Sequence, residues 1–313
     1  QRVTAIAISG TPGGDGGAVV LDCQASAFED VANNPTLQQH GISVTEIKDT
    51  IDPNLLSATL NLTDVGHNDE GASFLRITAD ETIDTTHVDL TKLFVVDQTG
   101  DSVLALTGAA ILPADGLVFT IVLTEVQRVF CLERSGEPGG DTVAILLDAR
   151  GAAVSDVGER PNPEKNAIVV TEAPDSRDPR VIAASINLGS GVFVITHSET
   201  VDATPSTNLD LSKLSIVERD RDSLVSGIGP NTIGSANLAN LLGATVAPSN
   251  LPAVTMQLTP DQRDWAIRNS NTPGGDRTPN VLEVVAAAIR DMALNPLDTS
   301  LNITVVETPD TTP

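Results

Sequence analysis

Hydrophobic residues occur along the chain in short runs that polar, proline-containing and glycine-containing segments interrupt. In the stretch Phe74–Thr78, apolar and polar positions alternate with a period of two, which is the pattern of a strand with one buried face. Because the runs are short and bounded by turn residues, they predict strands. The predicted strands are 55–62, 74–78, 117–123, 142–149, 152–155, 167–171, 181–188, 193–196 and 254–258, and Asp89–Leu93 and Asp210–Leu214 each open a further one.

Two short segments carry helix start signals instead. Thr124 and Thr259 are each followed three residues later by a glutamine, Gln127 or Gln262, which is the pattern of a capped helix N-terminus. Pro260 stands at the first helical position of the second segment. Both predicted helices end before a Pro-Gly-Gly-Asp turn. About seven or eight strands with one short helix predict an all-β class and, within it, immunoglobulin-like β-sandwich repeats.

The same elements recur in tandem. A Gln-Arg pair, the Pro-Gly-Gly-Asp turn and a turn running from Asp to Pro mark each copy; they lie at 1–2, 12–15 and 30–35, at 127–128, 138–141 and 156–161, and at 262–263, 273–276 and 291–296. Spacings of about 126 and about 135 residues predict domains of ordinary size. We therefore expect the C-terminal part of a repeat at 1–47, full repeats at 48–173 and 174–308, and the start of a linker at 309–313.

The composition of the chain argues against several classes of binding partner. The formal net charge of −24 argues against nucleic acid and anionic membrane surfaces, because both need basic patches. No apolar run approaches the roughly 20 residues that span a bilayer, so we expect no direct membrane insertion. The chain has no Tyr and one Trp, which argues against an aromatic sugar-binding platform.

The chain resembles a known family of repeats. The likeness lies in the run Phe193–Asp202 followed by Asp210–Leu214, in the Leu-Thr-x-x-Gln-Arg segments, in the Asp-x-x-x-Asn-Pro turns and in the Asp-Thr-Thr-Pro linker. These resemble bacterial-type Ig-like, cadherin-like repeats of very long extracellular adhesins and cell-surface scaffold or filament proteins. The resemblance implies an extracellular, cell-surface location; it leaves function open, because such repeats serve as spacers as often as binders. Cadherin proper has more explicit calcium motifs at its junctions, and this chain lacks them.

Acidic residues recur where one repeat meets the next: Asp49, Asp52, Asp175, Asp178 and Asp310, with Glu81 and Glu199 expected in the loop after the second strand. Calcium takes roughly six to eight oxygen ligands, and convergent carboxylates suit it. Calcium bound there would stiffen a hinged array. The competing interpretation is that the Asp-Pro segments form turns and that the acids are solvated. No EF-hand spacing supports calcium, and no cofactor is required.

Other candidate chemistry is sparse. Cys23 and Cys131 are interpreted either as small buried hydrophobes or as an interdomain or intermolecular crosslink. Asn61 and Asn302 stand in N-glycosylation sequons. The four histidines match no zinc spacing, no Gly-x-Ser-x-Gly elbow occurs, and the Gly-Gly-Asp turns lack the Lys-Ser/Thr of a phosphate loop, so we predict no enzyme.

Two hypotheses for function follow. In the first, the chain is a structural rod or filament subunit that associates with itself into a fibre or tandem array. Residues 1–45 lack strands to cover their apolar face, and these strands come either from a longer chain or from a neighbouring subunit by strand addition. In the second, it is a calcium-dependent adhesin that binds a glycan or protein ligand. Only the Gly/Asn-rich insertion around Gly227–Gly243, predicted to be a surface loop, offers a ligand-binding loop.

Overall fold

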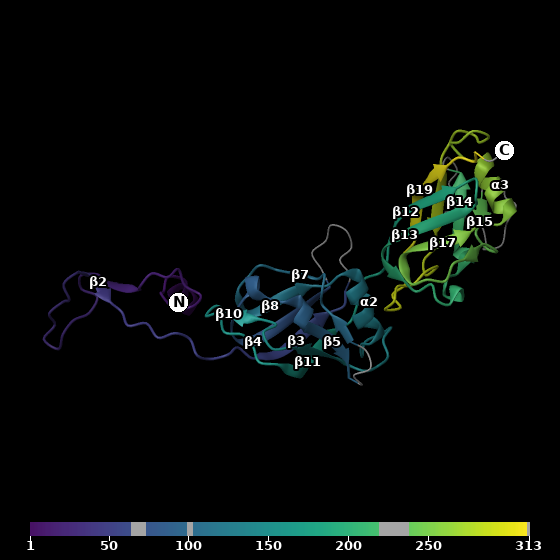
Figure 1. The fold of residues 1–313 in the computed structure, drawn as a ribbon. Coiled ribbons are helices and arrows are strands. Elements are labelled where there is room, and N and C mark those ends of the chain that lie inside the picture. The colour runs from purple at the N-terminus through teal and green to yellow at the C-terminus, as the bar shows by residue number, and fades with distance from the viewer. Residues whose placement is uncertain (64–72, 99–102, 219–237, 312–313) are drawn as a thin grey trace. The chain divides into compact units, whose positions relative to one another are not determined.

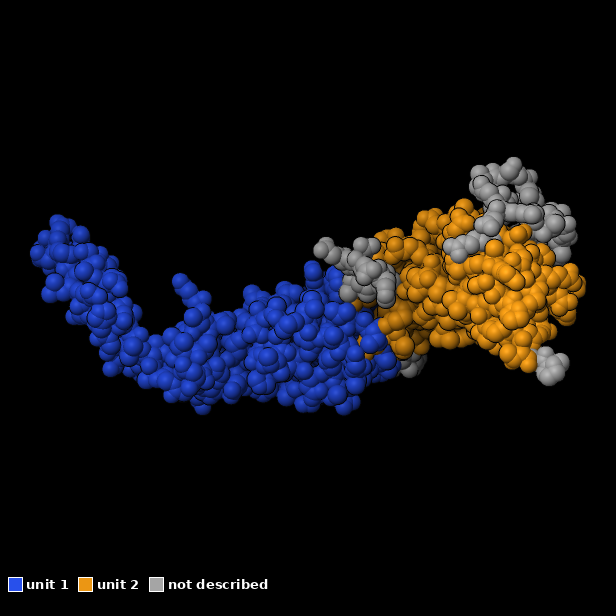
Figure 2. Space-filling view, turned by 90° about the horizontal axis from the view of Figure 1, so that it is seen from above, with its two compact units in different colours: residues 1–60, 74–124, 145–171 blue, residues 61–73, 125–144, 172–313 orange. Residues whose placement is uncertain are grey.

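The computed structural model describes residues 1–63, 73–98, 103–218 and 238–311 of the chain. These form two compact units, coloured separately in Figure 2. The first unit comprises residues 1–60, 74–124 and 145–171. The second comprises residues 61–73, 125–144 and 172–313. The helix that follows Thr124 therefore belongs to the second unit.

The first unit begins with the partial repeat. Helix α1 (Arg2–Ala7) is followed by β1 (Val20–Cys23) and β2 (Gln39–Ser43), which pair as a two-stranded antiparallel sheet (Figure 1). Leu21 and Phe28 are 53% and 68% exposed, whereas their repeat equivalents Leu147 and Val154 are fully buried. The apolar face expected for residues 1–45 is thus open in this chain.

The rest of the first unit is built on one sheet. Its strands run in the order β6-β5-β9-β11-β3-β4-β8-β7, and β10 pairs with β4. Alternate residues of β4 and β8 point into the core, where Leu75, Ile77, Phe119 and Ile121 are at most 1% exposed. The elements are β3 (Leu55–Asn61), β4 (Phe74–Asp84), β5 (Leu93–Asp97), β6 (Val103–Ala105), β7 (Ala110–Ile111), β8 (Gly116–Val122), β9 (Ile145–Ala149), β10 (Ser155–Asp156) and β11 (Lys165–Ala173), with 3₁₀ turns η1 (Thr85–His87) and η2 (Leu90–Lys92).

The second unit repeats this arrangement. Its sheet has the order β15-β14-β18-β19-β12-β13-β17-β16, in which β12 and β19 are parallel and the other pairs antiparallel. Trp265 and Ala266 of α3 pack against a core that includes Phe193 and Leu282. The elements are α2 (Glu125–Glu133), β12 (Val181–Asn187), β13 (Val192–Val201), η3 (Ser206–Asn208), η4 (Leu211–Lys213), β14 (Leu214–Glu218), β15 (Leu238–Asn240), β16 (Thr245–Val246), β17 (Leu251–Gln257), α3 (Pro260–Arg268), β18 (Asn280–Val284) and β19 (Ser300–Thr308).

The all-β class is confirmed, and the Ig-like sandwich topology stays a prediction. The capping box of α3 is confirmed: the Thr259 side chain accepts from the Gln262 backbone, and the Gln262 side chain accepts from the Thr259 backbone. The strand predicted at 152–155 is wrong, because Ala152 has a φ of 57° and turns the chain, so that β10 is only two residues long. Of the insertion, 227–237 lies outside the described residues.

The loop predicted for Glu81 and Glu199 is also wrong. Glu81 lies within β4 and Glu199 within β13, because both strands continue past the stretches with regular alternation. The pairing register shifts between Thr78 and Ile83 in β4, and between Thr196 and Val201 in β13. A bulge of this kind re-aims side chains locally, and both glutamates stand inside it.

Candidate functional site

A buried arginine with several carboxylates is the most distinctive polar site of the second unit. Arg128, on α2, is 1% exposed. Its guanidinium donates to both oxygens of Glu125 at 2.8 Å, to Asp175 Oδ2 at 2.9 Å and to Glu199 Oε2 at 3.1 Å. It also donates to the Leu62 carbonyl oxygen at 3.3 Å. Together with Asp291, whose carboxylate lies within 4.8 Å of those of Asp175 and Glu199, these residues form what we call the Arg128 cluster.

The local structure explains how each carboxylate reaches Arg128. Glu125 stands one helical turn before Arg128 on α2. Its carboxylate also accepts from the Thr200 backbone N–H at 2.8 Å. Asp175 begins an Asx turn by accepting from the Arg177 backbone N–H at 3.0 Å. Asp291 opens the turn 291–296, where it accepts from the backbone and side chain of Asn295 at 2.8 and 2.9 Å.

The Arg128 cluster contains more carboxyl groups than guanidinium groups. Burial works against the charge on Arg128, but the hydrogen bonds and charges of Glu125, Glu199 and Asp175 outweigh it and raise the pKa of the guanidinium. Burial likewise opposes ionisation of Glu125, yet Arg128 holds the pKa of that carboxyl below its usual range. Desolvation raises the pKa of Asp175, and it raises the pKa of Asp291 to about 6. The site therefore favours a proton or a cation beside the guanidinium.

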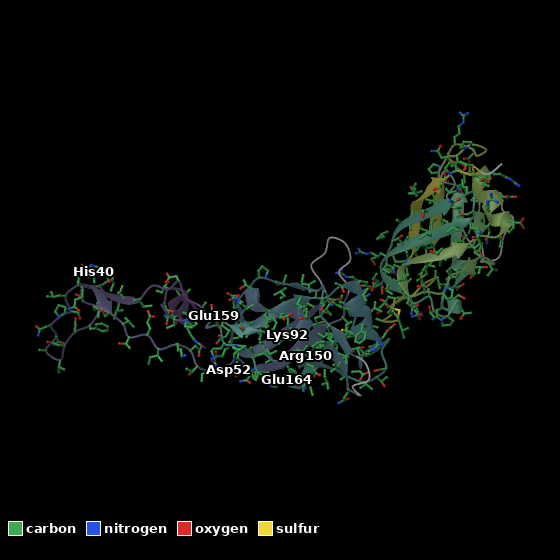
Figure 3. All side chains as sticks on the ribbon, viewed as in Figure 1. His40, Asp52, Lys92, Arg150, Glu159 and Glu164 are labelled. Atoms are coloured by element: carbon green, nitrogen blue, oxygen red, sulfur yellow. The ribbon has the colours of Figure 1, made fainter. Side chains whose placement is uncertain are left out.

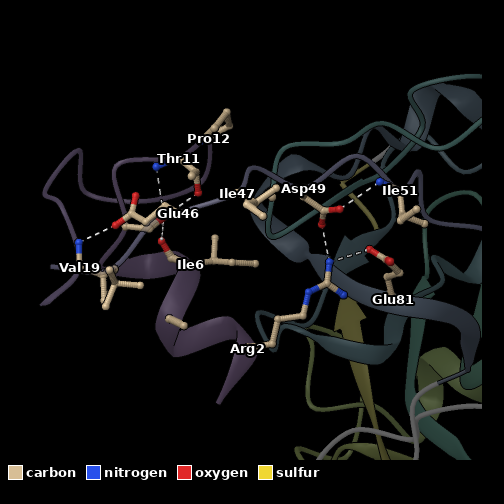
Figure 4. Close-up of a pocket in the computed structure, with 14 residues that line it drawn as sticks. Arg2, Ile6, Thr11, Pro12, Val19, Glu46, Ile47, Asp49, Ile51 and Glu81 are labelled. Atoms are coloured by element: carbon tan, nitrogen blue, oxygen red, sulfur yellow. Dashed lines mark hydrogen bonds and ion pairs between the residues drawn. The ribbon is translucent and has the colours of Figure 1, made fainter. Parts of the chain in front are cut away.

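The first unit contains a second version of this site, the Arg2 cluster of Arg2, Asp49, Glu81 and Asp156. Figure 4 shows Arg2, Asp49 and Glu81 of this cluster. Arg2, from α1, donates to Asp49 and to Glu81 Oε2, the latter at 3.0 Å, and lies 3.9 Å from Asp156 Oδ2. Asp156 is 1% exposed, and its Oδ2 makes no hydrogen bond with the part of the chain that the structure describes. Burial, reinforced by Glu81 and Asp49, raises the pKa of Asp156 to about 6.

A pocket of about 550 Å³ adjoins the Arg2 cluster. Ile6, Ile47 and Ile51 supply apolar walls, and Arg2, Glu46, Asp49 and Glu81 supply charged ones (Figure 4). Glu46 ties two segments of this pocket together by accepting from the backbone N–H groups of Gly10 and Val19. Glu172 and Glu307 make the same kind of bond, to the N–H groups of Gly136 and Asn271.

Glycine turns make close backbone contacts beside both clusters. Gly13 and Gly139, in the Pro-Gly-Gly-Asp turns after α1 and α2, have φ values of +85° and +90°. A Cβ at either glycine would lie closer than 3.0 Å to a backbone carbonyl oxygen, that of Val157 or that of Met292. These oxygens belong to the residues directly after Asp156 and Asp291. Each cluster is therefore flanked by an equivalent backbone contact, and we call cluster and contact together a repeat junction.

The third copy of the arginine is arranged differently. Arg263, on α3, donates to Asp310 and to the Leu188 carbonyl oxygen, just as Arg128 donates to Asp175 and to Leu62. Within residues 1–63, 73–98, 103–218 and 238–311, Arg263 forms an ion pair with Asp310 alone. Of the atoms that the structure describes, a Cβ at Gly274, with φ +95°, would meet only Ile267 Cγ2, at 3.9 Å.

The structure brings together some of the acids predicted from the sequence. Asp49 joins Glu81, Asp175 joins Glu199, and Asp310 pairs with Arg263. Asp52, which is labelled in Figure 3, instead forms an ion pair with Arg160. Asp178 belongs to neither carboxylate group. Sequence reasoning missed the three arginines and Asp156 and Asp291 as partners. Their signal was present, because the Gln-Arg pairs and the Asp turns recur in every repeat.

The remaining predicted residues play local roles. Cys23 and Cys131 are buried free thiols, 8% and 0% exposed. Burial raises the pKa of Cys131 to about 12. His197 is buried with its pKa lowered to about 4, whereas His40 and His87 lie beside Asp22 and Asp84; His67 is outside the described residues. A crosslink through the cysteines and glycosylation of Asn61 and Asn302 stay predictions.

Comparisons with known proteins add little. No family model matches the sequence, and no curated protein matches it. Among solved structures, the N-terminal part of the bacterial S-layer protein SbsC matches at 9% identity and a TM-score of 0.27, over 67% of this chain and 44% of that one. The S-layer protein rSbsC(31-844) matches at 8% identity and a TM-score of 0.29, over 82% of this chain and 26% of that one. At such scores neither match supports an argument about function.

No helix in the described part of the chain is both long and apolar enough to cross a membrane.

Proposed function

We propose that this chain is a segment of an extracellular structural protein at a cell surface, in which tandem β-repeats act as spacers of a rod or filament. The observation that carries the proposal is the Arg128 cluster. A guanidinium from the helix of one sequence repeat is buried among carboxylates of the next. The Arg2 cluster repeats these ion pairs with an arginine side chain that is 51% exposed. A buried ion cluster of this kind specifies geometry, because each partner left alone is costly. It suits a link that holds one repeat on the next.

Limited trypsin digestion tests whether the Arg128 cluster holds the linker. The Arg177 backbone N–H is bonded to Asp175, and Asp175 is held by Arg128, so we expect slow cleavage after Arg177 in the native chain. The variant Arg128→Met should release Asp175 and speed this cleavage severalfold. Arg134→Met, a change in the turn directly after α2 and outside the cluster, is the matched control. Equal cleavage rates in all three chains would count against a holding role.

Negative-stain electron microscopy of the full chain at low micromolar concentration tests the structural role itself. Straight particles with one repeated spacing, or filaments, are expected of a spacer array. Particles in which the angle between neighbouring repeats varies at random would contradict the proposal. The open apolar residues of 1–47, including Leu21 and Phe28, support the narrower proposal that strands of another repeat complete this segment.

The alternative function, a calcium-dependent adhesin, has one specific observation in its favour. Both clusters contain more carboxylates than guanidinium groups, and Asp156 Oδ2 is buried without a hydrogen bond to any described residue. Hard carboxylate oxygens at this spacing fit calcium, although in each cluster an arginine already neutralises part of the charge. Isothermal titration with calcium tests binding, and a glycan or protein ligand would have to be sought separately. Heat of binding absent at millimolar calcium would dismiss this alternative.

A further inference from the structure

We infer that the surface formed by Arg263, Gly274 and Asp310 is a docking site for the turn Asp30–Pro35 of a second copy of this chain. The inference rests on the proposed structural function and gives it a mode of assembly. It follows from the two repeat junctions already present within the chain. Each pairs an arginine and a Gly-Gly turn with the Asp turn of the next sequence repeat.

The two occupied junctions show which features an Asp turn needs in order to pack against an arginine and a Gly-Gly turn. In each, the turn glycine, Gly13 or Gly139, lies against the carbonyl oxygen of the residue after the turn aspartate. In each, that aspartate, Asp156 or Asp291, is buried beside the arginine. The glycine leaves space for the backbone, and the opposite charges orient the turn. The Met292 side chain, next to Asp291, is only 8% exposed in the junction.

The docking site on the second unit has the arginine and the Gly-Gly turn of an occupied junction, but no Asp turn lies against them in the described part of the chain. Gly274 has nearly the same φ as Gly139, at +95° against +90°, and among the described residues only Ile267 Cγ2 lies within 4 Å of a Cβ built on it. Arg263 keeps the two contacts, to a strand-end carbonyl and to a linker aspartate, that Arg128 also makes. Arg263 therefore stands in the geometry of an occupied junction.

The turn Asp30–Pro35 is preformed and uncovered. Asp30 accepts from the Asn34 backbone N–H at 2.8 Å, as Asp156 does from Arg160 and Asp291 from Asn295. Asn33 has a φ of 65°, close to those of Glu159 and Leu294 at 60° and 71°. Val31, the equivalent of Met292, is fully exposed at 106%. The turn thus has the shape of the occupied ones, and all of its residues are exposed.

Because the second unit carries the surface and the first unit carries the turn, the contact is heterologous and joins copies head to tail. The segment 1–47 has no equivalent of Glu199, and Pro260 stands at the position equivalent to Glu125, so this junction contains two carboxylates fewer than the Arg128 cluster. We therefore expect it to be weaker, with association visible at high micromolar concentration.

Sedimentation velocity of the full chain tests this, with one variant for each side. Gly274→Asn blocks the surface, because Asn tolerates a positive φ but fills the space that the carbonyl oxygen needs. Its control is Gly108→Asn, at a φ of +90° in the first unit. Val31→Arg blocks the turn, and its control is Leu37→Arg, a substitution of an apolar residue 81% exposed in the same segment. Thermal unfolding of each variant verifies that it folds.

The expected result is concentration-dependent growth of the native chain and of both controls beyond dimers. Each blocked variant alone should stay monomeric. An equal mixture of the two should form dimers and stop there, because one intact surface and one intact turn remain. A native chain that stays monomeric, or association that both blocks leave unchanged, would overturn the inference. Either result leaves the proteolysis test of the proposed function untouched.

Discussion

Gly139 and Met292 approach so closely that position 139 has no room for a side chain. A Cβ there would lie closer than 3.0 Å to the Met292 carbonyl oxygen and 2.9 Å from the Ala293 Cα, and both of these are backbone atoms. Backbone of this kind cannot move aside as the end of a flexible side chain can. The contact links two segments that are far apart in the sequence. It is possible only because residue 139 is a glycine and has no Cβ.

Gly139→Ala should therefore destabilise the second unit severely, whereas Gly274→Ala should not. Both residues have a positive φ, which costs an alanine roughly 1–2 kcal/mol in either place. Only position 139 adds a clash with backbone. Thermal unfolding monitored by circular dichroism should show a clearly larger loss for Gly139→Ala. Equal losses at the two positions would mean that the close approach has no energetic role.

Removing Arg128 should cost far more than removing Arg2. Arg128→Met leaves buried carboxylates without their cation, a loss of about 3–5 kcal/mol in comparable buried pairs. The Arg2 side chain is 51% exposed, so its ion pairs are screened, and Arg2→Met should cost roughly 1 kcal/mol or less. Urea unfolding of the two variants against the native chain measures the difference. A smaller loss for Arg128→Met than for Arg2→Met would contradict the assignment.

Asp291 should make stability fall as pH rises. Its folded pKa is raised to about 6 from an ordinary value of 3.8, so its contribution is fully present below pH 3.8 and is lost as pH rises through 6. Asp291→Asn keeps an acceptor for Asn295 without the charge. It should raise stability at pH 7 by up to about 3 kcal/mol, the equivalent of the pKa shift. Denaturant curves at pH 4 and pH 7 measure this, and an effect equal at both values would contradict it.

Calcium, if it binds the Arg2 cluster, should raise the unfolding temperature in a way that depends on Asp156. We expect millimolar calcium to raise it relative to a chelator, and Asp156→Asn to reduce the rise. Asp52→Asn is the control, because Asp52 lies outside the cluster and pairs with Arg160. Identical melting curves with calcium and with chelator would end the calcium prediction for both clusters.

Cys131 should be inert in the folded chain. It is fully buried, and burial raises the pKa of its thiol to about 12, so almost no thiolate exists at pH 8. We expect iodoacetamide to modify Cys131 only after unfolding, as measured by mass spectrometry of the digested chain. Rapid modification in native buffer would show that the helix α2 opens locally.

Much of the fold could be read from local pattern. The strands that begin at Leu55, Phe74 and Val181 were predicted because alternation and turn residues are properties of neighbours in sequence. The capped start of α3 was predictable for the same reason. Glu199 was assigned to a loop because a bulge in β13 depends on its partner strand β17, which lies more than fifty residues later.

By itself, the sequence determined the all-β class, the tandem repeat and the acidic residues that recur in it, since each follows from composition, short-range pattern or internal spacing. Only the tertiary structure decided that Arg128 lies among Glu125, Asp175 and Glu199, that Asp291 joins them, and that Asp178 does not. The reason is physical: a carboxylate looks the same in sequence whether water or a guanidinium neutralises it. Burial and the folding together of distant segments decide which of the two it meets.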